Sequence, residues 1–303
     1  MSKKNISDHL LKVHSPKHEE ISFVNTKVNS DTTLFIDPVL IEIGTSNFCN
    51  RAKKVLKDFF DQFYNAYYIT NNSADKIQLF SHAREVNDSH LGYAKRYGHG
   101  NTEDGLIEIF KGVEDYIGNI NITRLFELVL YVPGFAEDGM SDLLTNVLYK
   151  ELSEFTLSEC KQNNVITKKS SSERYYWDTE IHNWKKYEGE SLVLDNEIFL
   201  LIPKEIVQQR YRFTCDNYLR SVIVENICQD AAVYDEKTKK EIRPPKDSVR
   251  ERLIKENGTL FETIKKFSLN NEKLLAEYQR IVDNKYKTLI LSNEELDSII
   301  YKS

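Results

Sequence analysis

Two apolar patterns alternate along this chain and limit the folds open to it. In one, apolar residues recur every three or four positions, which predicts amphipathic helices. In the other, a short continuous apolar run ends at proline or glycine, which is typical of a buried strand. Helical spacing covers about residues 50–66, 102–117 and 142–162, and the strand-like runs end at Asp37-Pro38, Pro133-Gly134 and Pro203. We therefore expect an α+β or α/β protein with a mixed central sheet flanked by helices.

The composition changes along the chain and indicates three parts. Residues 1–20 are polar and hold three of the seven histidines, which favours a loosely ordered N-terminal arm. Residues 21–243 contain the strand and helix patterns and form the expected core. After Pro244-Pro245 the sequence is charged, with two amphipathic helical stretches separated near residues 268–271. Residues 244–303 are therefore predicted to form a helical C-terminal appendage.

The overall composition excludes several classes of protein. Hydrophobic residues make up 40% and charged residues 29%, as in an ordinary globular protein. The net charge of −6 argues against coating of duplex nucleic acid by bulk charge, although a local basic groove is compatible with it. The chain has no apolar run long enough to cross a membrane and no signal-like start, and its four cysteines lack metal-ligand spacing. We expect a cytoplasmic protein with no membrane contact and with reduced, buried cysteines.

Glycine is scarce, and its clustering points to a first candidate site. Four of the eleven glycines lie between Gly92 and Gly105, in a segment that also holds basic residues. Such a segment predicts a flexible basic loop before a helix, in which Lys95 and the backbone amides of Gly98 and Gly100 bind phosphate. The spacing fits neither the P-loop nor the dinucleotide fingerprint, and an ordinary turn-forming loop is the alternative.

A second candidate site follows the apolar run 125–132, which predicts a buried strand closed by Pro133-Gly134. Asp138 and Asp142 come next, at the start of a predicted helix, and two such carboxylates are suited to holding Mg²⁺. Lys204 ends the apolar strand predicted over 198–202 and is expected to assist the attacking water. In the alternative, Ser141 or Asp142 only caps the helix and Asp138-Gly139 only forms the turn.

The remaining patterns give four local expectations. On the helix predicted over 142–162, one polar row contains Asp142, Asn146, Tyr149 and Ser153 and is expected to be exposed, with Asn146 binding ligand. Glu151 points toward the apolar side, either as an edge residue that reaches solvent or as a buried carboxylate with a raised pKa. Trp177 and Trp184 are seven residues apart, so two turns of helix would align them. Residues 191–207 predict a hairpin that turns at Asp195-Asn196, with a central second strand.

Several of these segments together resemble a pattern in poorly characterised bacterial proteins of the phage-defence type. The segments are residues 133–146, 155–160 and 200–204, together with Glu85-Val-Asn and the stretch that starts at Leu91-Gly-Tyr. The resemblance covers about residues 30–210, and what it implies is a role in defence against mobile DNA.

The chain is also similar in outline to the PD-(D/E)XK nucleases, which bind Mg²⁺ through a helix-borne Glu and a strand-end Asp, with a Lys nearby. Glu85, Asp142 and Lys204 occur in that order. The sequence departs from the pattern in two ways: about 60 residues separate Asp142 from Lys204, and Ile202 stands where the family has an acidic residue. The similarity implies these three residues as a catalytic set.

Three functions stay open at this point. The first is a Mg²⁺-dependent nuclease of antiviral defence that cleaves DNA or RNA. The second is a non-catalytic subunit whose helical tail docks on an ATPase, helicase or effector of the same system. The third is binding of a nucleotide signal by the glycine-rich loop. Homo-oligomerisation through the C-terminal helices is a further expectation.

Overall fold

The computed structural model describes residues 5–11, 16–84, 86–93, 102–169, 172–286 and 290–301. Its α-helices are α1 (Ile6–Leu10), α2 (Pro38–Ile43), α3 (Asn47–Tyr64), α4 (Ser73–Phe80), α5 (Glu103–Ile109), α6 (Glu137–Val147), α7 (Tyr149–Gln162), α8 (Cys215–Tyr218), α9 (Val224–Asp230), α10 (Lys246–Asn257), α11 (Leu260–Asn270), α12 (Lys273–Tyr286) and α13 (Asn293–Tyr301). Two π-helical segments, η1 (Asn65–Ile69) and η5 (Leu219–Ile223), extend α3 and α8, and the 3₁₀ helices are η2 (Val113–Asp115), η3 (Leu125–Leu130) and η4 (Lys204–Ile206). The strands are β1 (Phe35–Ile36), β2 (Lys168–Lys169), β3 (Tyr175–Asp178), β4 (Asn183–Lys186), β5 (Glu190–Leu194), β6 (Glu197–Phe199), β7 (Val207–Gln208), β8 (Val233–Asp235) and β9 (Lys240–Ile242).

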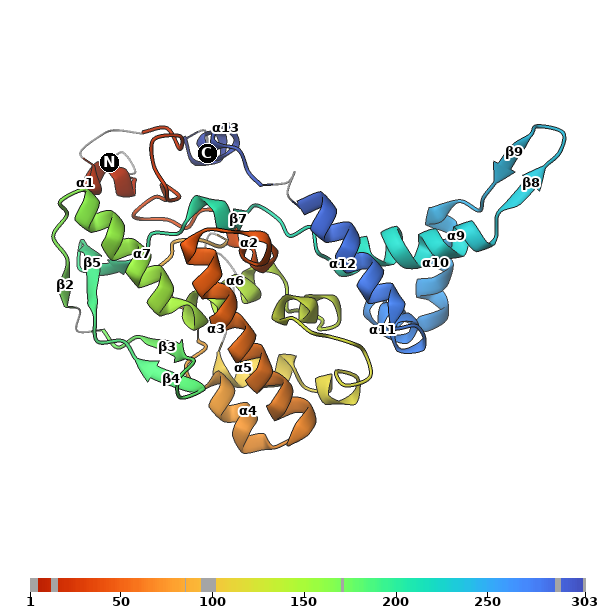
Figure 1. Cartoon of the computed structure of the whole chain (residues 1–303), viewed down its shortest axis with the longest axis horizontal. Helices are drawn as coiled ribbons and strands as arrows, with labels where there is room; N and C mark the ends of the chain where they lie inside the picture. The colour runs from red at the N-terminus through yellow and green to blue at the C-terminus, as the bar shows by residue number, and fades with distance from the viewer. Residues whose placement is uncertain are drawn as a thin grey trace.

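The elements form a main body and a helical lobe (Figure 1). The body contains α1–α7 and β1–β7. The helical lobe contains α8–α12, and the β8–β9 hairpin projects beyond it. Helix α13 returns to the body, where it contacts Pro16 and His18 of the N-terminal arm (Figure 1). None of the helices in the described ranges is long and apolar enough to cross a membrane.

The α+β class is confirmed, but the sheets are smaller than the sequence suggests. The described strands pair antiparallel in four separate sheets: β1–β7, β2–β5–β6, β3–β4 and β8–β9. The hairpin at Asp195-Asn196 is confirmed, since both turn residues have the positive φ that a tight hairpin turn requires. Its second strand is an edge strand of three residues instead of the expected central strand, because residues 200–203 leave the ladder and bond to other segments.

The strand predicted over 125–132 is wrong, because residues 125–130 form the 3₁₀ helix η3. Leu125, Leu128 and Leu130 are all buried, and a short, mainly apolar run does not distinguish a buried strand from a buried helix. The carboxylate of Glu127 accepts hydrogen bonds from the N–H groups of Thr123 (2.7 Å) and Arg124 (3.2 Å). These bonds satisfy the free amides at the helix start and favour the helical form.

The helix predicted over 142–162 is two helices, α6 and α7, which meet at Leu148. The row expected to face solvent is also wrong beyond Asp142, because Asn146, Tyr149 and Ser153 are buried. Strand β3 packs on both helices, and the segment that carries Asp88 covers Tyr149. These coverings come from parts of the chain far away in sequence, so the helical periodicity does not reveal them.

The tryptophan pair lies on a hairpin and not on a helix. Trp177 in β3 and Trp184 in β4 are direct register partners. Their rings meet edge to face with centroids 5.5 Å apart, and Phe59 of α3 packs against both. A spacing of seven residues is compatible both with two turns of helix and with paired positions in a hairpin. The spacing alone therefore did not distinguish the two, and the helical alignment was the wrong one.

The described residues of the N-terminal arm, which the sequence predicts to be loosely ordered, pack against other parts of the chain. Ile6 and Leu10 of α1 are buried, and His18 is 0% exposed because α13 covers it. Helices α10, α11 and α12 pack on α9, α8 and η5, respectively, all of which precede the two prolines. The interruption expected near 268–271 occurs at Asn271, and a further break lies at Gly258, where φ is +93°.

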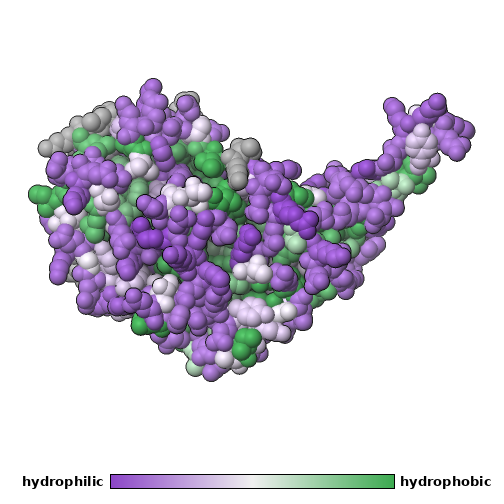
Figure 2. Space-filling view, in the orientation of Figure 1, coloured by the Kyte–Doolittle hydropathy of each residue, from purple (hydrophilic) through white to green (hydrophobic). Residues whose placement is uncertain are grey.

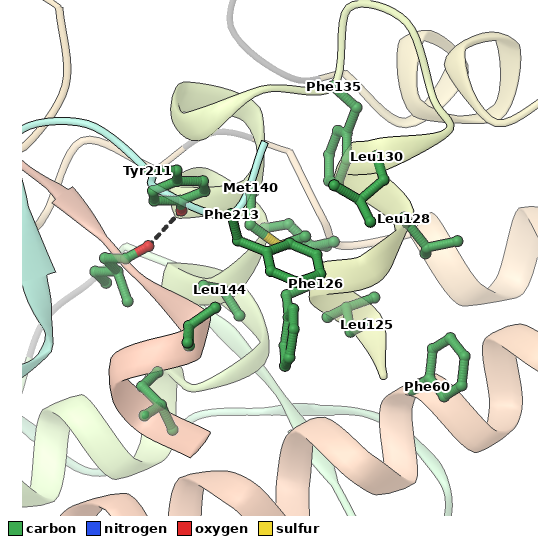
Figure 3. Packing of buried hydrophobic residues seen from close by; sticks show 14 of the residues in the cluster. Phe60, Leu125, Phe126, Leu128, Leu130, Phe135, Met140, Leu144, Tyr211 and Phe213 are labelled. Carbon is green, nitrogen blue, oxygen red and sulfur yellow. Dashed lines mark hydrogen bonds between the residues drawn. The ribbon is translucent and has the colours of Figure 1, made fainter. Parts of the chain in front are cut away.

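A large aromatic and aliphatic core lies directly behind the start of α6 (Figure 3). Phe126 of η3 meets Phe213 edge to face at 5.0 Å, and Met140 of α6 is buried beside them. The hydroxyl of Tyr211 donates a 2.5 Å hydrogen bond to the carbonyl of Ile36 in β1. This core fixes the start of α6 relative to β1 and to the segment that leads into the helical lobe.

Candidate functional site

The two predicted metal ligands, Asp138 and Asp142, lie one turn apart on the same side of α6. The helix begins at Glu137, after Ala136, and no side chain caps it. Ser141 is not a cap: its hydroxyl oxygen accepts a 3.0 Å hydrogen bond from the N–H of Ile36. Because Asp138 lies inside the first helical turn and both carboxylates are partly exposed, the interpretation as a cap and turn alone does not describe this segment.

The side chain of Asp138 packs against the first described residues of the glycine-rich segment. The N–H of Tyr93 donates a hydrogen bond to this carboxylate. Gly92 has a φ of +127°, and a Cβ atom built there would lie 3.0 Å from Oδ1 of Asp138. Glycine is therefore needed at position 92 both for its backbone conformation and for the close approach of the carboxylate.

Negative charge accumulates around Asp138. Burial raises the pKa of Asp138, and the negative charges of Asp31 and Glu137 raise it further. Tyr93 lies beside the same charges, with its hydroxyl 3.5 Å from the Glu137 carboxylate and its ring against Phe35. We refer to Asp31, Glu137, Asp138 and Asp142 as the α6 acidic cluster.

The segment 86–93, which brings Gly92 to Asp138, is anchored by a partly buried ion pair. The carboxylate of Asp88 accepts hydrogen bonds from Nε (2.7 Å) and Nη2 (2.8 Å) of Arg174 and from the hydroxyl of Tyr149 (3.0 Å). The carbonyl of Asp88 also accepts a bond from the N–H of Leu200. Two parallel bonds from one guanidinium fix the carboxylate in position, so this segment has a rigid base.

Asn146, predicted to bind ligand, is buried beneath the acidic cluster. Its amide donates to the carbonyls of Arg84 (2.8 Å) and Asp142 (3.0 Å). It therefore positions Arg84, the last described residue before Glu85, beside α6. Glu85, Lys95, Gly98 and Gly100 were also predicted as site residues, and they lie outside the described residues.

Lys204 lies in a different cluster, beside the C-terminal helix. Its ammonium group donates to the carbonyl of His18 and, at 2.9 Å, to the side-chain oxygen of Asn293 in α13. Burial lowers the pKa of Lys204, although the carboxylate of Asp297 nearby opposes that shift. The structure thus brings Asp138 and Asp142 together and directs Lys204 toward α13.

Asp37, which ends the first predicted strand, is buried and structural. Its carboxylate accepts a 2.9 Å bond from the N–H of Val39, at the start of α2, and a 3.1 Å bond from the hydroxyl of Tyr286. Burial raises the pKa of Asp37 to about 7. Tyr211 is also buried, which raises its pKa, and the negative charges of Asp37 and Asp142 raise that pKa further, so both carboxylates lie near this tyrosine.

The donor set is compatible with a hard cation that also binds phosphate. Mg²⁺ commonly takes one or two protein carboxylates and completes its coordination with water and substrate phosphates. Asp138 and Asp142 are such a pair. Within the described ranges, no group of three or more His, Cys, Asp or Glu side chains is arranged to hold a metal ion. The four cysteines are buried and form no disulfide, as expected.

Sequence reasoning missed Asp31, Tyr93 and the Asp88–Arg174 pair. Asp31 lies in a polar stretch before a strand, where an aspartate is usual in a turn. Asp88 and Arg174 are separated by 86 residues, so only the fold reveals their contact. The nearest signal is the glycine spacing itself, because Gly92 opens the segment that meets Asp138.

The sequence profile described as a domain of unknown function (DUF8370) matches residues 12–214. The chain therefore belongs to this family. No curated protein and no solved structure matches it. The match ends at Thr214, the N-cap of α8, so the acidic cluster and the segment 86–93 lie inside the family region and the helical lobe begins where that region stops.

Proposed function

We propose that this DUF8370 protein is a Mg²⁺-dependent nuclease that binds nucleic-acid phosphates at the α6 acidic cluster and hydrolyses phosphodiester bonds. One observation carries the proposal: the start of the basic, glycine-rich segment packs on Asp138. An acidic pair suited to a cation and a segment suited to phosphate therefore adjoin. A metal bridging protein carboxylates and a phosphate needs both features side by side.

The charges around Asp138 support the choice of a divalent cation. Asp31 and Glu137 lie close enough to disfavour ionisation of Asp138, so a bound cation would relieve their repulsion. Mg²⁺ at this place would polarise the phosphate and lower the pKa of a bound water. Asp138 and Asp142 hold the cation in the proposal, and the N–H of Tyr93 orients Asp138.

Lys204 is not assigned a chemical role in the proposal. Its ammonium group already makes two hydrogen bonds, one of them to Asn293 of α13. A group that activates water has to point at the reacting phosphate. We therefore assign Lys204 to holding α13 on the body.

The test is cleavage of labelled single- and double-stranded DNA and RNA by the full-length protein, in Mg²⁺ and in EDTA. We expect Mg²⁺-dependent cleavage that falls by about a hundredfold or more in Asp142→Asn and Asp138→Asn, because each removes a charged ligand. Asp230→Asn, on the exposed end of α9, is the matched control and keeps full activity. Equal activity in all three variants would refute the assignment.

A role in antiviral defence in the cytoplasm is part of the same proposal and rests on the resemblance of residues 30–210 to phage-defence proteins. Expression in bacteria is expected to lower phage plating efficiency, and Asp142→Asn is expected to abolish that protection. Protection that persists in Asp142→Asn would separate the defence role from the proposed chemistry.

A second candidate function, a non-catalytic subunit that docks on another protein, is favoured by the β8–β9 hairpin. Val233, Tyr234 and Ile242 are 66%, 63% and 56% exposed. The hairpin projects from the helical lobe, and Figure 2 shows apolar side chains near its base. If this function holds, Val233→Ser with Ile242→Ser abolishes co-purification with the products of neighbouring genes. In the nuclease proposal, the same double variant keeps cleavage.

A further inference from the structure

A polar cavity of about 390 Å³ lies beside the acidic cluster and plays no part in the proposed chemistry so far. Its walls come from three separate segments: Asn29 and Asp31 from the loop before β1, Asn87 and His90 from the segment 86–93, and Glu197 from the start of β6. The volume falls at the small end of the range for small-molecule sites. A group the size of one sugar ring would fit.

His90, which forms one wall of the cavity, is held rigidly. It has a φ of +51°, a left-handed conformation that costs free energy for a non-glycine residue. Its carbonyl accepts a 2.9 Å bond from the N–H of Thr32, and its ring stacks on Phe199 with centroids 4.3 Å apart. With the preceding Asp88 held by Arg174, the imidazole is fixed before any ligand arrives.

The lining decides what chemistry the cavity accepts. Two carboxylates, from Asp31 and Glu197, disfavour a phosphate or another anion in the cavity itself. Carboxylates, side-chain amides and an imidazole in one small space are suited to a neutral ligand with several hydroxyl donors.

The cavity and the acidic cluster share Asp31. Asp31 lines the cavity, and its charge also acts on Asp138. Thr32, the next residue, pairs with both His90 and Gly92 through its backbone, at 2.9 and 3.0 Å. One short stretch therefore borders the cavity at His90 and the phosphate-binding region at Gly92.

We propose that this cavity binds the ribose of the nucleotide whose phosphate lies at the acidic cluster, so that the substrate is RNA. In an RNA strand the 2′-hydroxyl is the free donor of this ribose, and it would donate to the carboxylate of Asp31 or Glu197, with Asn87 contributing its amide. The 2′-hydroxyl is the group by which a protein distinguishes RNA from DNA. The choice of RNA rests on the proposed function, whereas the recognition of a ribose does not need the metal or the cleavage step.

The test uses uncharged nucleosides, which avoid the metal and the phosphate altogether. Saturation-transfer difference NMR with the full-length protein compares adenosine with 2′-deoxyadenosine, and uridine with 2′-deoxyuridine. We expect each ribonucleoside to bind about tenfold more tightly than its deoxy counterpart, because a site built for a hydroxyl leaves its partner unpaired without one. The signals should be strongest at the ribose protons and independent of the base.

The variants separate this inference from the nuclease proposal. Glu197→Gln and Asn87→Ala change exposed side chains and are expected to bring ribonucleoside binding down to the deoxy level. Glu188→Gln, also exposed, is the matched control and keeps the difference. Asp138→Asn is expected to lose cleavage and keep nucleoside binding. If nucleosides do not bind, or if ribo- and deoxynucleosides bind equally, the ribose site is overturned even if nucleic acid is cleaved. If binding is ribose-selective but no nucleic acid is cleaved, only the nuclease proposal is overturned.

Discussion

Glu151 on α7 provides a test of whether the folded protein buries this carboxylate. Its carboxylate is 7% exposed, and its Oε2 makes no hydrogen bond among the described residues. Of the two alternatives for this residue, the buried carboxylate with a raised pKa is confirmed. Burial raises the pKa of Glu151 from 4.5 to about 7, and the negative charge of Glu154 adds to the shift.

The raised pKa of Glu151 determines how the unfolding free energy changes with pH, both in sign and in size. Because the folded state holds the proton more tightly than the unfolded chain, the stabilisation is complete below pH 4.5 and is lost as the pH rises through 7. With these two pKa values, linkage gives a loss of about 2.5 kcal/mol in unfolding free energy between pH 5 and pH 8 from this group alone. Glu151→Gln cannot ionise, so it escapes that loss.

The assay is denaturant unfolding followed by the fluorescence of Trp177 and Trp184, at several pH values from 5 to 8. As the pH rises from 5 to 8, the unfolding free energy of Glu151→Gln minus that of the natural protein is expected to increase by about 2.5 kcal/mol. Glu159→Gln, a partly exposed site on the same helix, is the control, and its difference from the natural protein should stay constant. Parallel pH profiles for the natural protein and Glu151→Gln would show that the carboxylate is not buried in the folded state, and the reasoning would fail.

Three further predictions concern the site and its supports. Asp88→Asn leaves Arg174 without its carboxylate and should lower the unfolding free energy by about 3 kcal/mol, measured by denaturant unfolding; a loss below about 1 kcal/mol would contradict the anchoring role. Lys204→Met should speed hydrogen exchange in α13 and leave Mg²⁺-dependent cleavage intact, whereas the sequence-based catalytic set predicts loss of cleavage. Gly92→Ala and Gly134→Ala both place a side chain at positive φ and should each cost about 1 kcal/mol in stability, but only Gly92→Ala should also impair cleavage, because only its Cβ reaches Asp138.

Local patterns predicted those parts of the fold in which one segment decides its own structure. The amphipathic spacing in α3 and the Asp195-Asn196 turn depend on neighbours within a few residues, and both are present in the structure. The run 125–130 and the tryptophan pair failed because their patterns are shared by two structures, and the choice depends on what packs against them. Burial of Tyr149 depends on Asp88, 61 residues away, which no local pattern contains.

In the candidate site, too, the features that depend on one segment agree with the sequence, and those that depend on distant segments do not. Asp138 and Asp142 were predictable because a helix start with two carboxylates is a local feature, and their spacing in α6 agrees with it. The sequence predicts Lys204 as a site residue because it places the lysine at a strand end. In the structure Lys204 instead begins the 3₁₀ helix η4, and α13 covers it. Asp31 and the cavity beside it come from three segments that meet only in the folded protein.

The hydrogen bonds around β1 connect the acidic cluster to the helical lobe. Ser141 of α6 accepts from the N–H of Ile36, whose carbonyl accepts from Tyr211. One residue later, Asp37 accepts from Tyr286 at the end of α12, and the same tyrosine hydroxyl accepts from the N–H of Phe213. α6 bonds to Ile36, the last residue of β1, and α12 bonds to Asp37, the residue that follows it. A shift of the helical lobe that moves Tyr286 is therefore expected to alter the support beneath the acidic cluster.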